Sequence, residues 1–308
     1  MIIVGIPVYN TNIHQFYTCA YSALAQTKPV QIVVVDDCSK EELGLQYKDF
    51  CEQHNIKYIR FEENRGVAAA RNAVINIAKK PFKYLAFLDS DDAIMCNFAE
   101  VLEENAIKNN ADVVISDIHA EAKTRVNDSY IKKDSNACWT HGKLYRIDYL
   151  KDNNICFPEN LRQNEDYVFN KQALLLTKNI YAIDKSFYIW RNYQESLTRK
   201  VRPEQWYRDN NTNVYLGQIM LFDLLFDRVE EKNHLGGLIV ALYGACQRQI
   251  IFGEEQFEIP ESVTEKIKII LQDNDKWYYE KFDISFFNKL FIQSPYEWLK
   301  SIGVETNV

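Results

Sequence analysis

The sequence predicts an α/β protein, with a mostly parallel sheet flanked by helices and a C-terminal region made of helices alone. Short apolar runs rich in β-branched residues alternate with segments of helical spacing through residues 2–116, and these runs are apolar on both faces. After residue 203 the helical spacing continues to the end of the chain. We therefore expect a Rossmann-like domain over residues 1–200 and a helical subdomain over residues 201–308.

The apolar runs and the helical segments give the expected order of elements. The predicted strands lie at residues 2–9, 31–35, 57–61, 84–88 and 112–116, and the helices between them at 13–26, 41–54, 67–79 and 99–109. A mixed region from residue 121 to residue 196 follows, with helices expected at 143–150 and 166–176 and short strands at 179–183 and 187–190. The C-terminal helices are expected at 203–230, 234–252 and 261–272, with shorter pieces near 285 and 297.

The composition fits a folded, acidic protein. The chain has 308 residues, of which 47% are hydrophobic, and this is enough for a large core in one or two domains. Its net charge of -7 lacks the basic footprint of a nucleic-acid-binding protein, which argues against such a partner without excluding a local basic patch.

The cysteines and the apolar segments bear on where the protein acts. Seven cysteines occur without a CxxC pair, so we expect reduced, buried thiols and neither a disulfide framework nor a zinc site. The N-terminus lacks the basic leader of a signal peptide, and the most apolar later stretch, residues 235–246, is too short to span a membrane. We expect a cytoplasmic protein without a transmembrane segment, and peripheral attachment to a membrane stays open.

Polar motifs follow the ends of the predicted strands. Residues 7–10, 36–39 and 89–92 come directly after three strands, and residues 64–72 lead into a helix. In sheets of this kind, ligands bind beyond the carboxyl ends of the strands. We therefore expect these segments at one edge of the sheet, where they can meet at one ligand.

Asp89-Ser90-Asp91-Asp92 is the most acidic of these motifs. Hard divalent cations bind carboxylates together with substrate phosphates, and the bound ion is a Lewis acid for a diphosphate leaving group. Three carboxylates at one strand end also repel one another unless a cation offsets them. The alternative is a polar turn in which Asp92 caps the following helix.

Asp36-Asp37-Cys38-Ser39 allows two roles. Ser39 and Glu42 fit a capping box for the next helix. The preceding carboxylates would then accept the imide N–H of a pyrimidine base or bind a ribose hydroxyl. Arg71 would pair with a carboxylate or stack on the base, although the sequence alone favours a solvated helix charge.

Together these motifs resemble those of family 2 glycosyltransferases with the GT-A fold. The matching stretches are 6–10, 35–39, 64–66, 70–72, 87–92, 142–146 and 165–166. Each stretch is a weak signal, but their common order within the first 200 residues is specific. The resemblance implies an inverting enzyme of the hexosyltransferase class, which moves a sugar from a UDP-sugar donor to an acceptor hydroxyl with the help of Mn²⁺ or Mg²⁺.

The resemblance also assigns roles to single positions. It implies a nucleotide site, usually for uridine, at Pro7, Tyr9, Asn10, Asp36 and Arg71. It implies contacts to the ribose or donor sugar from Asp89 and Ser90, and a metal ligand at Asp91. Asp166 would be the general base, and Glu165 would orient a sugar hydroxyl or that base.

The chain departs from the family pattern at two places. Cys38 stands where glycine or asparagine is common. The segment after the strand at 187–190 lacks the familiar metal-binding histidine, which leaves the third protein ligand open. The same segment carries Arg191, which fits a diphosphate clamp or an ordinary surface arginine, and also Ser196 and Thr198.

Glu165 and Asp166 stand at the start of a predicted helix. A carboxylate that takes the proton of the attacking hydroxyl typically contributes about 10²–10⁴-fold in rate. The helix N-terminus favours the ionised form, but this makes first-turn carboxylates common for structural reasons too. The residues alone favour a structural role for Asp166, and the resemblance favours the catalytic one.

Residues 139–143 are the last candidate segment. Trp139 offers an apolar face for sugar C–H groups, and with Lys143 it would line an acceptor or sugar pocket. Burial of Trp139 in the core fits equally well. His141 is interpreted as an ordinary loop residue.

Two other functions stay open. A nucleotidyltransferase would share the sheet and the acidic ligands, but it usually has a Gly-rich basic loop where residues 7–12 have neither glycine nor a basic residue. A non-catalytic nucleotide-sugar-binding or assembly protein would be indicated by a broken metal or base motif, and both motifs are intact. The acceptor is open among a glycan, a lipid-linked glycan and another hydroxyl substrate. The C-terminal helices would recognise it or form a homo-oligomer.

Overall fold

The structure is a computed structural model that describes residues 1–121, 129–132, 139–191, 193, 203–229, 233–251, 259–273 and 295–304. The chain divides into two compact units, Met1–Val201 and Arg202–Val308. The predicted boundary after residue 200 lies beside this division.

The N-terminal unit is built on one nine-stranded sheet. Its strands are β1 (Ile2–Val8), β2 (Gln31–Asp36), β3 (Lys57–Arg60), β4 (Tyr84–Phe87), β5 (Ala93–Ile94), β6 (Val113–Glu121), β7 (Ser129–Lys132), β8 (Lys143–Arg146) and β9 (Ile180–Trp190). They are ordered β3-β2-β1-β4-β8-β6-β9-β5, with β7 paired to β6. The strands β3, β2, β1 and β4 are parallel, whereas β8 is antiparallel to both β4 and β6. The carboxyl ends of β1, β2 and β4 therefore meet at one edge.

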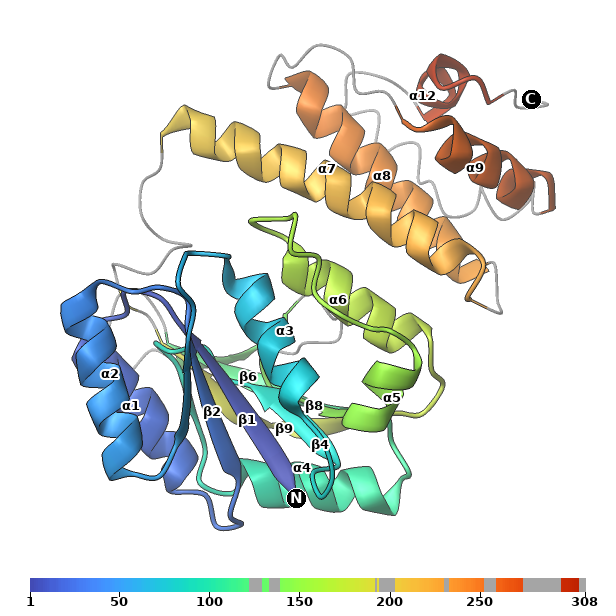
Figure 1. Cartoon of the computed structure of the whole chain (residues 1–308). Coiled ribbons are helices and arrows are strands. Elements are labelled where there is room, and N and C mark those ends of the chain that lie inside the picture. Colours follow the sequence, from blue (N-terminus) through green and yellow to red (C-terminus); the bar gives the residue numbers. More distant parts are fainter. Residues whose placement is uncertain are drawn as a thin grey trace. The chain divides into compact units, whose positions relative to one another are not determined.

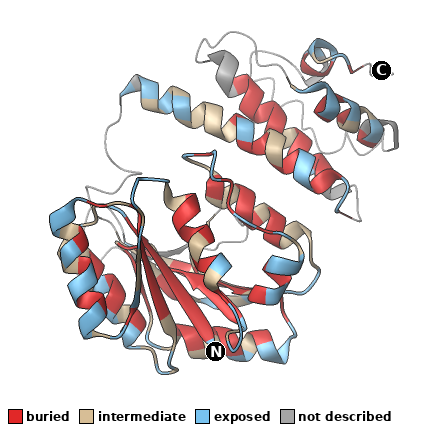
Figure 2. Ribbon diagram, in the orientation of Figure 1, coloured by how far each residue is buried: buried red, intermediate tan, exposed pale blue. Residues whose placement is uncertain are grey.

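Helices cover both faces of this sheet (Figure 1). They are α1 (Ile13–Leu24), α2 (Glu41–Gln53), α3 (Val67–Ile77), α4 (Phe98–Lys108), α5 (Ile147–Asp152) and α6 (Glu165–Leu175). Strand β1 alternates between the two layers: Val4 packs in a core with Phe16 of α1, and Ile3 packs in another with Val74 of α3. Burial on both faces explains why the central strands read as continuous apolar runs (Figure 2).

The α/β class with helices on both faces is confirmed, and three local predictions were wrong. The helix expected at 143–150 is strand β8 followed by α5, because Lys143–Arg146 pairs with β4 and β6 in the middle of the sheet. The two short strands expected after residue 179 are one strand, β9, with a register shift opposite Ser116 and Asp117. Strands β5 and β7 were not predicted.

All the regular elements described in the C-terminal unit are helices. They are α7 (Glu204–Phe226), α8 (Asn233–Ile251), α9 (Glu261–Asp273) and α12 (Pro295–Ser301), and the piece expected near residue 285 lies outside the described residues. Buried Phe222 and Leu242 belong to the core of α7 and α8. Within the described part of the chain, none of the helices has the length and apolar character needed to cross a membrane.

The six described cysteines are free thiols. Cys19, Cys51 and Cys246 are buried as expected, but Cys96 and Cys156 are exposed. The prediction of buried thiols was wrong at these two positions. Cys96 lies between β5 and α4 and Cys156 follows α5, so neither is on the inner face of a helix or strand.

Candidate active site

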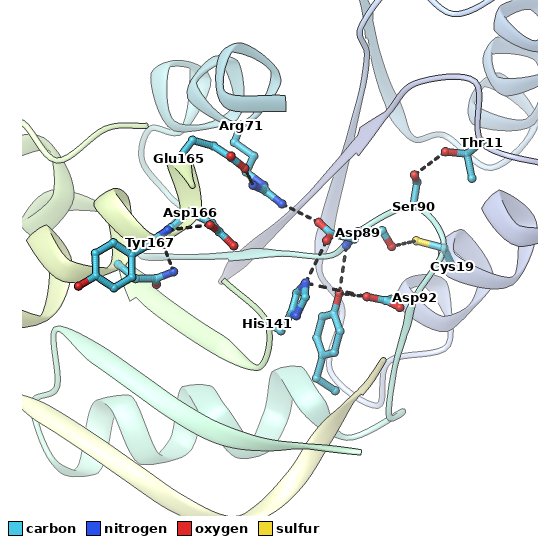
Figure 3. A network of polar contacts seen from close by, with 12 residues as sticks. Thr11, Cys19, Arg71, Asp89, Ser90, Asp92, His141, Glu165, Asp166 and Tyr167 are labelled. Carbon is cyan, nitrogen blue, oxygen red and sulfur yellow. Dashed lines mark hydrogen bonds and ion pairs between the residues drawn. The ribbon is translucent and has the colours of Figure 1, made fainter. Parts of the chain in front are cut away.

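The carboxylate of Asp89 follows strand β4 and is held by two cationic side chains. Its Oδ1 accepts a hydrogen bond from Nη2 of Arg71 at 2.8 Å, and its Oδ2 lies 2.9 Å from Nε2 of His141 (Figure 3). Burial alone would raise the pKa of Asp89, but Arg71 and His141 outweigh it and hold the pKa below its usual range. Asp89 is therefore ionised at neutral pH.

Arg71 is buried in helix α3 and bridges two carboxylates from different elements. Besides its bond to Asp89, its Nη1 donates a hydrogen bond to Oε1 of Glu165 at 3.0 Å. Only 4% of Arg71 is exposed. The interpretation of Arg71 as a solvated helix charge was therefore wrong, because α6 and the turn after β4 cover this face of α3. Its place near a base or diphosphate stays a prediction.

Asp92 is buried and ties strand β9 to the turn after β4. Its Oδ2 accepts a hydrogen bond from the hydroxyl of Tyr188 at 2.7 Å, and its Oδ1 accepts one from the backbone N–H of Arg191 at 2.8 Å. Burial raises the pKa of Asp92 to about 7, with His141 opposing the rise and the neighbouring carboxylates adding to it. The alternative in which Asp92 caps the following helix is wrong, because α4 begins only at Phe98.

His141 belongs to this cluster, and the interpretation of it as an ordinary loop residue was wrong. Its ring stacks on Tyr188 with 4.7 Å between centroids and an interplanar angle of 20°. Burial would lower the pKa of His141, but its hydrogen bond with Asp89 and the charge of Asp92 raise it above the usual value. The one signal in the sequence was its position directly before the matching stretch 142–146.

Contacts of the residues beside His141 fix the loop before β8 that carries it. The ammonium of Lys143 is buried and donates a hydrogen bond to the carbonyl of Trp139 at 2.6 Å. Gly142 has φ of 67°, and a Cβ there would lie 2.9 Å from Oγ of Ser116. Trp139 is partly buried against the core beneath α1 and α4. The predicted acceptor or sugar pocket at Trp139 and Lys143 stays a prediction, and Lys143 has a structural role in the loop.

Asp89, Asp92 and His141 could together hold a metal ion. One ligand atom from each lies within 4.8 Å of the others, among the residues that the structure describes. Two carboxylates and an imidazole suit Mn²⁺ better than Mg²⁺, which prefers oxygen ligands. The predicted ligand Asp91 is not one of the three, so its role stays a prediction. Asp92 belongs to the three carboxylates for which a cation was expected, whereas His141 was missed because it comes from a separate element.

Glu165 and Asp166 open helix α6 after Asn164, which has a positive φ of 69°. Burial and the neighbouring carboxylate raise the pKa of Glu165 to about 7, although Arg71 opposes the rise. Asp166 accepts a hydrogen bond from the backbone N–H of Tyr167 at 2.7 Å. Burial raises the pKa of Asp166 above its usual value, against the opposing effects of Arg71 and that N–H.

Two buried side chains fix the first turn of α6. The hydroxyl of Tyr145 on β8 donates a hydrogen bond to Oδ1 of Asn170 at 2.5 Å, and Nδ2 of Asn170 donates to the carbonyl of Asp166 at 2.8 Å. The sheet therefore sets the position of the turn that carries Asp166.

Asp36, expected at the nucleotide, is fully buried at the end of β2. Its Oδ1 accepts a hydrogen bond from the backbone N–H of Ser39 at 2.8 Å, and its Oδ2 accepts hydrogen bonds from Tyr58 and Arg60. These bonds give Asp36 a structural role, and a role in nucleotide binding stays a prediction. Ser39 does not form the predicted capping box, because its Oγ accepts a hydrogen bond from the backbone N–H of Asn10.

The other expected nucleotide residues lie in β1 and after it. Pro7 is within the strand, the ring of Tyr9 is half exposed, and Asn10 has a positive φ of 50°. The hydroxyls of Thr11 and Ser90 are 2.7 Å apart, so the turns after β1 and β4 are joined. Their contacts to a nucleotide stay predictions.

Arg191 directly follows β9. Its Nη1 donates a hydrogen bond to the hydroxyl of Tyr193 at 3.1 Å, and its Nε lies 3.8 Å from Oε1 of Glu121. The diphosphate clamp predicted for Arg191 stays a prediction, and Ser196 and Thr198 lie outside the described residues.

Curated proteins with similar sequences are glycosyltransferases. Glycosyltransferase GlyA of Streptococcus pneumoniae is 30% identical over 229 residues, which are 67% of this chain and 32% of GlyA. The poly(ribitol-phosphate) beta-N-acetylglucosaminyltransferase TarS of Staphylococcus aureus is 29% identical over 223 residues, which are 66% of this chain and 38% of TarS. The chain therefore spans only about a third of the length of these two relatives.

Solved structures show the same fold. The crystal structure of TarS residues 1–349 in complex with UDP-GlcNAc has a TM-score of 0.65 and 22% sequence identity, and the match covers 90% of this chain and 81% of that one. This likeness confirms the predicted GT-A fold. The model of the family described as Glycosyl transferase family 2 matches residues 3–163, about half of the chain. Because this family model matches about half of the chain, the protein belongs to glycosyl transferase family 2.

Proposed function

We propose that this protein is an inverting glycosyltransferase, which moves a sugar from a UDP-sugar to an acceptor hydroxyl with a divalent metal and a carboxylate base. One observation carries the proposal. The carboxylate of Asp89, fixed at the end of β4 by two cations, is linked through Arg71 to the turn that carries Glu165 and Asp166 (Figure 3). A donor-side carboxylate and the helix turn that carries the candidate base are therefore joined through one guanidinium.

Asp166 is the residue to which we assign the general base. Its Oδ1 accepts a hydrogen bond from the backbone N–H of Tyr167 in its own helix, and the residue is only partly buried. It therefore keeps lone pairs that can accept a proton from an attacking hydroxyl. Glu165 is less suitable, because it is buried and its Oε1 already accepts a hydrogen bond from Arg71.

The group Asp89, Asp92 and His141 fits a divalent cation in its size and in its ligand types. A bound Mn²⁺ or Mg²⁺ would supply Lewis-acid stabilisation of the leaving diphosphate. A neutral His141 would offer a ring nitrogen to the ion, whereas a protonated His141 would leave the metal to the carboxylates and stabilise Asp89 through their hydrogen bond. Asp91 is the further carboxylate that we expect at the ion.

The similarity to TarS supports a UDP-sugar donor, with UDP-GlcNAc as the first candidate. By its name TarS forms a β linkage, whereas UDP-GlcNAc holds its sugar in an α linkage, so such a transfer inverts the anomeric carbon. The acceptor is proposed only as a hydroxyl-bearing glycan or polyol. The free thiols support a cytoplasmic location, and we assign acceptor recognition or oligomerisation to the C-terminal helices.

A panel of nucleotide sugars tests the proposal. The protein is mixed with UDP-GlcNAc, UDP-glucose, UDP-galactose, GDP-mannose and CTP in Mn²⁺ or in EDTA, and both the melting temperature and the release of nucleoside diphosphate are measured. We expect a metal-dependent stabilisation and slow hydrolysis with one UDP-sugar. Stabilisation without any turnover in the presence of glycan acceptors would instead indicate a binding protein. Pyrophosphate release from CTP would indicate a nucleotidyltransferase.

A further inference from the structure

A single guanidinium serves two separate parts of the proposed site. Arg71 on α3 bonds Asp89 after β4 at 2.8 Å and Glu165 at the start of α6 at 3.0 Å. Figure 3 shows Asp166 on the same side of this bridge, beside Glu165 and facing the space next to Asp89 and His141. Arg71 is therefore positioned to act on Asp166 without bonding it.

The bridge is held rigidly on the α6 side. The guanidinium lies 5.3 Å from the ring centroid of Phe157, and that ring stacks on Phe169 of α6 with 3.9 Å between centroids. Arg71 itself is buried, so it has little freedom to reach another partner. A lysine at this position would keep the charge but lose the planar fork that can bond two carboxylates at once.

The charges around Asp166 come from four elements. Arg71 on α3 and, when protonated, His141 before β8 favour its ionised form. Asp89 after β4 disfavours it, and Glu165 on its own helix is the carboxylate with which it competes. His141 is already hydrogen-bonded to Asp89. The guanidinium of Arg71 is thus the main positive charge that opposes the mutual repulsion of Glu165 and Asp166.

We propose that Arg71 is a positioning residue for the base: its fork, bonded to Asp89 and Glu165, fixes the start of α6 relative to Asp89, and its charge lies beside Asp166. This inference rests on the proposed function of Asp166 as the base. It gives Arg71 two separable tasks, one carried by charge and one by geometry.

The direction of the effect follows from the charges. An opposite charge nearby favours the ionised carboxylate, so loss of the Arg71 charge raises the pKa of Asp166. The base is then ionised only at higher pH, and the acidic limb of the pH profile of kcat/KM moves upward. A nearby unit charge typically shifts such a pKa by about 1–3 units.

Two variants at one position separate the tasks. In Arg71→Gln we expect the acidic limb of kcat/KM to rise by about 1–3 pH units. In Arg71→Lys the limb stays near its wild-type position, whereas kcat falls because one ammonium cannot hold both carboxylates. Arg65→Gln is the matched control: it removes a charge just before the same helix, from an exposed pair with Glu159, and should leave the limb in place.

A measurement without turnover keeps the inference apart from the proposed function. The protein is labelled with ¹³C at aspartate carboxyl carbons, Asp166 is assigned with Asp166→Asn, and its titration is followed in wild type and in both Arg71 variants. An unchanged Asp166 pKa in Arg71→Gln overturns the inference even if transfer is lost. A raised pKa in a protein that never transfers sugar supports the electrostatic coupling and removes only the role as a base.

Should Arg71→Gln fail to fold, Glu165→Gln tests the same electrostatics from the other side. Removal of the competing carboxylate ends its repulsion of Asp166 and leaves the Arg71 charge shared between Asp89 and Asp166, so the Asp166 pKa should fall. A rise in this variant contradicts the inference.

Discussion

Two acidic turns flank strand β1, and they look alike in the sequence but differ in the structure. Asp36-Asp37 follows β2, and Asp89-Ser90-Asp91-Asp92 follows β4. In the first turn, main-chain N–H groups of Ser39, Arg65 and Gly66 donate to the two carboxylates, and Asp36 also accepts from Tyr58 and Arg60 on the neighbouring strand β3. The second meets ionisable side chains from α3, from the loop before β8 and from β9.

The difference is visible in the pKa values of the two turns. Burial raises the pKa of Asp37, and its N–H donors and Arg162 only partly offset this. Two cations reverse the same effect at Asp89 and lower its pKa. At Asp37, backbone N–H groups hold the loop in place. At Asp89, ionisable side chains from other elements bring possible ligand atoms close together. A role for an acidic turn in chemistry thus depends on which donors surround it.

The largest effect is expected in the turn after β4. Asp91→Ala should abolish transfer and metal-dependent donor binding, because a carboxylate expected at the cation is lost, while the melting temperature without metal stays near wild type. Turnover and isothermal titration with UDP-GlcNAc and Mn²⁺ measure this. Asp49→Ala, an exposed aspartate on α2, is the control. Full activity of Asp91→Ala in EDTA would end the metal proposal.

The next effect concerns the base. Asp166→Asn should lose at least about 10²-fold in kcat and keep its affinity for the nucleotide, because only the proton acceptor is removed. Asp148→Asn changes an exposed first-turn aspartate of α5 in the same way and should remain active. Wild-type turnover in Asp166→Asn would move the base to another residue.

The third effect concerns the affinity for the metal ion, to which His141 should contribute. His141→Ala should weaken Mn²⁺ binding about 10–100-fold, as expected when a ligand or its supporting partner is lost. Electron paramagnetic resonance of free Mn²⁺ measures this without any turnover. His14→Ala, at an exposed histidine on α1, is the control. An equal affinity of both variants for Mn²⁺ would show that Asp89, Asp92 and His141 form a hydrogen-bonded network and not a metal site.

Stability should respond in the turn after β2. Asp36→Ala removes the acceptor shared by Tyr58 and Arg60, and breaking such a buried pair costs about 3–5 kcal/mol. Because about a third of Arg60 is exposed, we expect about 2 kcal/mol in urea unfolding. Unchanged unfolding together with lost UDP binding would instead give Asp36 the nucleotide role predicted for it.

The smallest effect is on pH dependence. Since the folded-state pKa of Asp37 is raised, its contribution to stability is present at low pH and is lost as the pH rises from about 4 through the raised value. The stability of wild type relative to Asp37→Asn should therefore fall over this range, as measured by melting temperature. A relative stability that grows with pH would mean that the N–H donors outweigh burial.

The sequence by itself determined the alternation of the parallel strands β1 to β4 with helices α1 to α3 and placed carboxylates at the strand ends, because apolar periodicity and turn chemistry are local. The stretch at 143–150 shows the limit: its spacing suits a helix, but the pairing partners of Lys143–Arg146 come from β4 and β6.

Only the tertiary structure decided which carboxylates share a cation. The partners of Arg71 are 18 and 94 residues away, and His141 reaches Asp89 across 52 residues. Sequence spacing carries no record of such distances, and the charge state of a carboxyl depends on its burial and on these partners. The carboxylates Asp89, Asp92 and Asp166 could therefore be named from the chain, whereas His141 and the bridge through Arg71 could not.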